Sequence, residues 1–186
     1  MDSFNSKTSF CGGSLLSSDT VLTAAHCVQF RSSVVVGFPK DDVSLKDGLK
    51  IWSSEIRIHP YYSNNKYPVP NNDVAIVKLS TPVIFDDTVL PICLPDPTKS
   101  YSGKLAEVAG WGNTNPKPMG IDPNFPVNLQ TVNVTTMTNE ECKKLFKWNE
   151  ITKDMICAAD PGKVWFTFSF LSFNSFLCFN YISLVF

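Results

Sequence analysis

The chain has 186 residues, a length that suits one sizeable domain and is common for all-β barrel proteins. Its 16 basic and 17 acidic residues give a formal net charge of −1, so it lacks the strongly basic character of proteins that bind nucleic acids or anionic membranes. Thirteen prolines, nine glycines and many short runs of Val, Ile and Leu favour short strands over long helices. We therefore expect a single all-β domain with no nucleic-acid partner.

Apolar runs bounded by polar turn residues predict strands along most of the chain. In chain order they are two strands in 12–24 around a turn at 17–20, then 32–38, 49–59, 74–79, 105–111, 127–134 and 155–158. One short helix is predicted near 138–146, because Thr138 and Glu141 have the spacing of a capping box. His26 follows the second strand, and Asp73 immediately precedes the apolar run at 74–79.

The six cysteines form no CxxC pair, which argues against a zinc ribbon or a thioredoxin-type motif. Disulfides formed in an oxidising compartment are the better interpretation. The first ten residues, MDSFNSKTSF, lack the basic and apolar regions of a secretion signal. We therefore expect that the true beginning of the protein is missing from this sequence.

The composition changes abruptly after Lys163. Residues 164–186 contain no charged side chain, glycine or proline, and hold half of the fourteen phenylalanines. A membrane-spanning helix fits the length, but several Ser, Thr and Asn residues weaken that interpretation. A strand-rich end would expose aromatic runs that aggregate. We favour translated intron, because the residue types match thymine-rich codons and Val164 needs a codon that begins with GT, as introns usually do.

The segment around His26 suggests acid–base chemistry. An imidazole accepts and returns protons near neutral pH because its unperturbed pKa is about 6.5. A histidine directly before a cysteine, after a strand and two small alanines, suits a general base on a tight turn. A lone histidine is nevertheless more often structural, so the surrounding sequence decides between the two interpretations.

The string FCGGSLLSSDTVLTAAHC at 10–27 resembles the segment around the catalytic histidine of the chymotrypsin and trypsin family of serine proteases. NNDVAIVKL at 71–79 is similar to the segment that holds the catalytic aspartate of that family. The resemblance implies that His26 is the general base and that Asp73 orients its imidazole. It also implies a disulfide between Cys11 and Cys27. The alternative interpretation of Asp73 is an aspartate in a surface turn without a catalytic role.

The resemblance continues through LPICLP, AGWGNT, ECKKLF and MICA, and defines a partial protease domain at 1–163, followed by the unrelated tail. It implies a fold of two six-stranded β-barrels, in which the first lacks only its first strand and the second lacks its later strands. It also implies a Cys142–Cys157 disulfide. Cys93 matches a cysteine that joins an upstream propeptide in many relatives, with a free buried thiol as the alternative.

The family motif GDSGGP, which supplies the nucleophilic serine and the oxyanion hole, has no counterpart here. The serines after Lys163 do not lie in glycine-rich turns, so none suits a nucleophile; they are Ser169, Ser172, Ser175 and Ser183. No Ile/Val-Val-Gly-Gly sequence precedes Phe10, so activation as in the family is not expected either. We predict a truncated chain that is inactive as written.

Two functional hypotheses follow. The first is a secreted, extracellular serine endopeptidase that hydrolyses peptide bonds through an acyl-enzyme, represented here by an inactive form. The second is a non-catalytic homologue that binds a protein partner. A protein or peptide substrate, or a protein partner, is expected in either case, and a membrane is not.

The remaining polar residues give weaker indications. Asn133 begins an N-V-T sequon, which predicts glycosylation in a secreted form. His59 is interpreted as a loop residue without a catalytic role. Four acidic residues lie where relatives sometimes hold calcium, but their spacing is too loose to predict a metal site; they are Asp41, Asp42, Asp47 and Glu55. No metal and no cofactor is expected.

Overall fold

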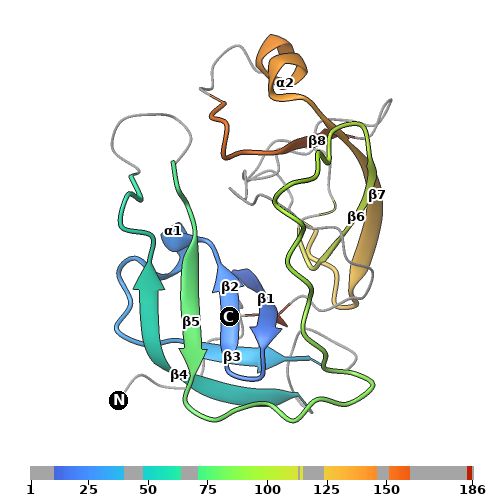
Figure 1. The fold of residues 1–186 in the computed structure, drawn as a ribbon. Helices are drawn as coiled ribbons and strands as arrows, with labels where there is room; N and C mark the ends of the chain where they lie inside the picture. The colour runs from blue at the N-terminus through green and yellow to red at the C-terminus, as the bar shows by residue number, and fades with distance from the viewer. Residues whose placement is uncertain are drawn as a thin grey trace.

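Six strands close the first barrel in the order β1-β2-β5-β4-β3-β9 (Figure 1). The computed structural model describes residues 11–39, 48–63, 71–112, 114, 124–145, 151–159 and 184–185. The elements of this barrel are β1 (Gly12–Ser17), β2 (Thr20–Thr23), α1 (Ala25–Val28), β3 (Val35–Phe38), β4 (Leu49–Ile58), β5 (Ala75–Leu79) and β9 (Leu184–Val185). All neighbouring strands pair antiparallel.

The barrel interior is filled by the inward-facing side chains of β1 to β5. In β5, Ala75, Val77 and Leu79 are buried, whereas Ile76 and Lys78 between them are partly exposed, as a strand with one face on a core requires. Leu15 and Val36 are fully buried and belong to the same cluster as Val77. This continuous apolar core supports the strand ends from which the site residues come.

The resemblance implies that the first barrel lacks one strand, but in the structure strand β9 completes it. Val185 pairs with Gly12 of β1 and with Gly37 of β3, and Leu184 pairs with Gly13. Two residues of the tail therefore occupy the gap between β1 and β3, where the backbone N–H and C=O groups of both strands need partners. Residues 160–183 and 186 lie outside the described residues.

The second body is a sheet of three strands in the order β6-β7-β8, within the described residues. Its elements are β6 (Leu105–Gly110), β7 (Gln130–Met137), α2 (Asn139–Leu145) and β8 (Cys157–Ala159). The fold is thus all-β, with this three-stranded sheet lying beside the closed six-stranded barrel (Figure 1), in keeping with the expected pair of barrels of which the second is incomplete.

The predicted capping box begins helix α2. The Thr138 hydroxyl accepts a hydrogen bond from the Glu141 N–H at 3.1 Å, and the Glu141 carboxylate accepts one from the Thr138 N–H at 2.9 Å. The Cys142–Cys157 disulfide then joins the helix to β8. The small buried cluster of this region consists of Cys142, Ile151, Met155 and Cys157.

Two predicted strands differ from the structure by three residues at a boundary. Strand β3 begins at Val35 rather than at Ser32, because the Val34 N–H donates to the Ser53 hydroxyl instead of to a strand neighbour. Strand β7 spans Gln130–Met137 rather than 127–134. Its extension is explained by pairing with β8, since Thr135, Thr136 and Met137 pair with Ala159, Ala158 and Cys157.

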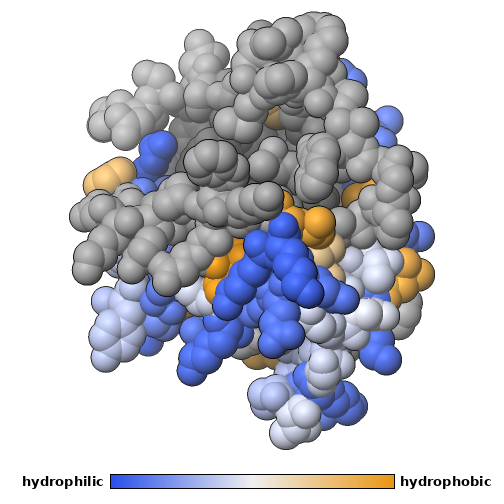
Figure 2. All heavy atoms as spheres, turned by 90° about the horizontal axis from the view of Figure 1, so that it is seen from above, coloured by the Kyte–Doolittle hydropathy of each residue, from blue (hydrophilic) through white to orange (hydrophobic). Residues whose placement is uncertain are grey.

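Hydrophilic residues dominate the described part of the surface seen from above, with smaller hydrophobic areas between them (Figure 2). Several large apolar side chains are more than half exposed, among them Phe30, Ile84, Leu94, Leu105 and Phe125. Within the described ranges, neither helix has the length and apolar character that crossing a membrane requires.

Candidate active site

His26 lies in the four-residue helix α1, which begins directly after β2. Ala25 and Val28 of this helix are buried in the barrel core and hold it against the strands. The helix lacks a side-chain cap at Ala24, so its position depends on this packing. The His26 side chain is 42% exposed and therefore accessible to a reacting molecule.

Asp73 lies two residues before the start of β5 and is only 3% exposed. The residue before it, Asn72, has a φ of 52°, a left-handed conformation that asparagine tolerates better than most residues. The side-chain amide of Asn72 donates a hydrogen bond to the backbone carbonyl of Tyr61 at 3.0 Å, and the backbone carbonyl of Asn72 accepts one from the Val74 N–H at 2.8 Å. This turn directs the Asp73 carboxylate away from solvent and toward α1, so the alternative of a surface aspartate is wrong.

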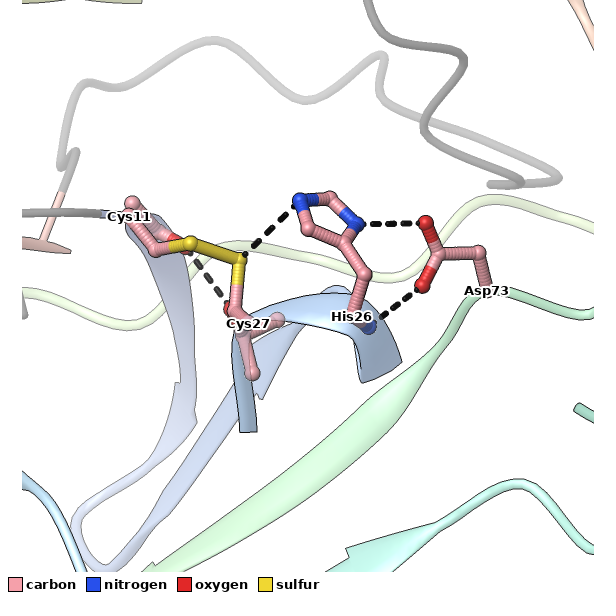
Figure 3. The surroundings of a disulfide bond; sticks show 6 residues. Cys11, His26, Cys27 and Asp73 are labelled. Carbon is pink, nitrogen blue, oxygen red and sulfur yellow. Dashed lines mark hydrogen bonds and ion pairs between the residues drawn. A yellow bond between two sulfur atoms is a disulfide. The ribbon is translucent and has the colours of Figure 1, made fainter. Parts of the chain in front are cut away.

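Both oxygens of the Asp73 carboxylate contact His26 (Figure 3). Oδ2 lies 2.6 Å from the imidazole Nδ1, and Oδ1 accepts a hydrogen bond from the backbone N–H of His26 at 2.8 Å. The two contacts fix the ring and its backbone together, although 47 positions separate these residues in the chain. A carboxylate on Nδ1 selects the tautomer with the proton on that nitrogen and leaves Nε2 as the proton acceptor.

The electrostatics favour the protonated imidazole. The hydrogen bond to Asp73 raises the pKa of His26 above its ordinary value of 6.5, while partial burial acts in the opposite direction. A buried carboxylate needs a charged or hydrogen-bonding partner, and His26 provides it. The pair can therefore take up a proton at Nε2 and stabilise the resulting positive charge.

The Nε2 side of the ring faces an open cavity of about 430 Å³ that is lined by Cys11, His26, Cys27, Phe30 and Arg31. The Cys27 sulfur lies 3.5 Å from Nε2 (Figure 3). Cys27 is joined to Cys11 in a disulfide whose Cα atoms are 6.1 Å apart. A disulfide sulfur has no hydrogen to donate, so this contact becomes a hydrogen bond only when Nε2 carries a proton.

Among the residues that the structure describes, the other cysteines and the second histidine lie apart from this pair. Cys142 and Cys157 form the second disulfide, and Cys93 is a free, exposed cysteine. The exposed position of Cys93 rules out the alternative of a buried thiol and leaves the external disulfide a prediction. His59 follows β4, where its ring contacts Tyr61 and its Nδ1 accepts a hydrogen bond from the Tyr61 N–H at 3.2 Å.

Asn133 is exposed in the middle of β7, opposite Glu107, and its glycosylation stays a prediction. Among the acidic residues considered for calcium, Glu55 forms an ion pair with Arg57 at 2.6 Å. The other three acidic residues and all four tail serines lie outside the described residues; they are Asp41, Asp42, Asp47, Ser169, Ser172, Ser175 and Ser183.

Sequence reasoning missed two parts of this site. One is Asn72, whose left-handed conformation sets the direction of Asp73, and the consecutive asparagines at 71–72 were an available signal for it. The other is the wall formed by Phe30 and Arg31, just beyond α1. No local pattern marks these two residues as cavity-lining.

Comparisons with known proteins agree with one another. The trypsin family model matches residues 1–164. Trypsin II-P29 of Gallus gallus and serine protease 1 of Rattus norvegicus are each 36% identical over 155 residues, which cover 83% of this chain and 59% of each relative. Among solved structures, neuropsin, a serine protease expressed in the limbic system of mouse brain, is similar with a TM-score of 0.72 and 25% identity. That match covers 85% of this chain and 67% of the neuropsin chain. The chain thus spans about three-fifths of the length of the curated relatives it matches.

Proposed function

This chain belongs to the trypsin family, and we propose that it represents a serine endopeptidase in which His26 is the general base and Asp73 holds it in place. The observation that carries the proposal is the double contact between Asp73 and His26, at 2.6 Å and 2.8 Å. A structural histidine rarely needs a buried carboxylate on both its ring and its backbone while its other nitrogen faces an open cavity.

In peptide-bond hydrolysis by such a pair, Nε2 of His26 accepts the proton of a serine hydroxyl as the oxygen attacks the carbonyl carbon of the substrate. The imidazolium then donates this proton to the leaving amine, and an acyl-enzyme remains. Water hydrolyses the acyl-enzyme by the same sequence of proton transfers. Asp73 keeps the proton on Nδ1 and stabilises the imidazolium, in keeping with the raised pKa of His26.

The nucleophile is assigned to no residue of this sequence. None of the four tail serines lies in a glycine-rich turn of the kind that exposes a catalytic serine. An oxyanion hole needs backbone N–H groups directed at the developing negative charge, and the sequence offers no motif for one. The 186-residue chain by itself is therefore proposed to be inactive toward peptide bonds.

The substrate class proposed is protein or peptide, and the compartment proposed is extracellular. Relatives named as trypsins support the first, and two disulfides support the second, since disulfides persist in oxidising environments. A propeptide joined through the exposed Cys93 is compatible with both.

A gain-of-function chimera tests the proposal. Residues 164–186 are replaced by a GDSGGP-containing segment of a family member, and a strand that begins with Ile-Val-Gly-Gly is placed before Phe10 to supply the activation sequence. The purified chimera is then treated with a fluorophosphonate that labels activated serines. We expect labelling of the chimera and none of the original chain. Labelling should fall by at least about 10³-fold in His26→Ala and by a smaller factor in Asp73→Asn.

The matched control for the chimera is His59→Ala, which changes the other histidine and should leave labelling intact. A folded chimera that is labelled equally well with and without His26 contradicts the assigned base. Labelling of the original chain contradicts the proposed inactivity.

A further inference from the structure

Three side chains with metal-ligating atoms meet on the cavity side of His26. The sulfurs of Cys11 and Cys27 and the imidazole of His26 offer one atom each, and these atoms all lie within 4.8 Å of one another. In the structure the two sulfurs are joined as a disulfide (Figure 3). We propose that reduction of this disulfide creates a binding site for zinc or a similar thiophilic divalent ion, formed by both thiolates and His26 Nε2. This metal site goes beyond the proposed peptidase function and does not depend on it.

The distances suit a tetrahedral zinc ion. Zinc binds thiolate sulfur at about 2.3 Å and imidazole nitrogen at about 2.0–2.1 Å, so tetrahedral angles separate sulfur from nitrogen by about 3.6 Å and sulfur from sulfur by about 3.8 Å. Cys27 Sγ already lies 3.5 Å from His26 Nε2. The Cys11 and Cys27 Cα atoms are 6.1 Å apart, so once the S–S bond is open, side-chain rotation can separate the sulfurs without moving the backbone.

Asp73 prepares the histidine for this second role. Metal-binding histidines commonly donate their other ring N–H to a carboxylate, which fixes the ring orientation and makes the ligating nitrogen more basic. The Asp73 carboxylate, 3% exposed, lies 2.6 Å from Nδ1 and so leaves Nε2 as the ligand. The contact that equips His26 as a base therefore also equips it as a ligand.

The fourth position of the metal is open to solvent. The cavity of about 430 Å³ borders all three ligands, so a water molecule can complete the tetrahedron. The two thiolates balance the charge of a divalent ion, and soft sulfur ligands favour zinc and cadmium over magnesium or calcium. An ion in this position occupies the Nε2 lone pair, so His26 can no longer accept a proton.

Formation of the site requires a reductant, which is a dithiol or a phosphine. A dithiol transfers two electrons and two protons to the Cys11–Cys27 bond, which gives two thiols and the oxidised, cyclic disulfide of the dithiol. Metal binding then displaces one proton from each cysteine. The disulfide therefore decides whether His26 is available as a base or held as a metal ligand.

The test measures metal binding rather than catalysis. The variant used has the full length and carries serine in place of every cysteine except Cys11 and Cys27; the substitutions are Cys93→Ser, Cys142→Ser, Cys157→Ser and Cys178→Ser. It is reduced anaerobically with a phosphine. It is then titrated with Cd²⁺, and the thiolate-to-cadmium charge-transfer absorption is followed. We expect one Cd²⁺ per reduced chain, competition by Zn²⁺, and no such band in the oxidised chain.

Two variants distinguish a built site from mere thiol binding. His26→Gln should weaken Cd²⁺ binding by at least about tenfold, and Asp73→Asn by about 10- to 100-fold because it removes the support of the ligand. His59→Gln is the matched control and should bind as the parent does. Unfolded chains with free thiols would bind Cd²⁺ with equal affinity in the parent, His26→Gln and Asp73→Asn. That result overturns the proposal, and so does an absence of Cd²⁺ binding by the reduced parent.

Discussion

The two bodies of this molecule differ in how completely they are built. The first barrel is closed by six strands around one apolar core that includes Leu15, Val36 and Val77. The described part of the second body is a three-stranded sheet whose buried cluster consists of four side chains, two of them disulfide-bonded cysteines. Leu105, on β6 of that sheet, is 68% exposed. Within the described residues, the chain thus contains one closed barrel core and one much smaller buried cluster.

This difference separates the candidate site from the incomplete part of the fold. His26 and Asp73 both come from the first barrel, from α1 and from the turn before β5. Their mutual contacts involve no residue of β6, β7 or β8. The base and its orienting carboxylate are therefore expected to form whenever the first barrel folds, whatever the state of the second sheet.

A matched pair of leucine substitutions gives the largest expected contrast. Leu15→Ala, at a fully buried position of β1, should lower the free energy of unfolding by about 2–5 kcal/mol, because it removes packed atoms and leaves a cavity. Leu105→Ala, at an exposed position of β6, should change it by less than about 0.5 kcal/mol. Urea denaturation of both variants measures the difference. Similar losses in the two would mean that the second sheet is covered in solution.

The two disulfides give the next contrast, because they close loops of nearly equal length, with sequence separations of 16 and 15. Replacing either pair by serines should lower the free energy of unfolding by about 3 kcal/mol. Hydrogen exchange should distinguish them: loss of Cys142–Cys157 should expose the amides of β7 and β8 and leave β5 protected. Uniform loss of protection in that variant would show that the two bodies unfold together.

The smallest effect concerns the pH dependence of the pair. The folded-state pKa of His26 is raised, so protonated His26 stabilises the fold; this contribution is complete below pH 6.5 and disappears as the pH rises through the folded-state pKa. Asp73→Asn should lower the pKa of His26 toward 6.5 and remove this part of the pH dependence. An NMR titration of the His26 imidazole measures the pKa, and His59→Gln removes the only other histidine signal. An unchanged titration in Asp73→Asn contradicts the role given to the carboxylate.

Much of the first barrel could be predicted from the sequence because its strands are short apolar runs bounded by polar turn residues. The prediction for 49–59 differs by one residue from β4, and that for 74–79 by one residue from β5. Strand β7 was shifted because Val127 and Leu129 extend the apolar pattern backward, whereas the pairing with β8 that determines its end involves the polar pair Thr135–Thr136. Pairing partners distant in sequence leave no trace in local periodicity.

The candidate site depended on a different kind of information. No spacing rule brings His26 and Asp73 together across 47 positions, and only the resemblance of their two segments to one family indicated that they meet. The direction of Asp73 depends on the left-handed Asn72, which is a property of the folded turn. Strand β9 could not be predicted either, because two residues are too few to show a period.

Strand β9 also has a consequence for the order of events during synthesis. Its partners β1 and β3 leave the ribosome well before Leu184 and Val185, which follow them by more than 140 residues in the chain. Until then the nascent barrel has two unpaired strand edges, which are the kind of surface that other unfolded chains and chaperones bind. Closure is thus a late, long-range step, and long-range strand pairing is slow because much loop entropy is lost before the contact forms. Translation speed through the tail is expected to determine how long those edges stay open.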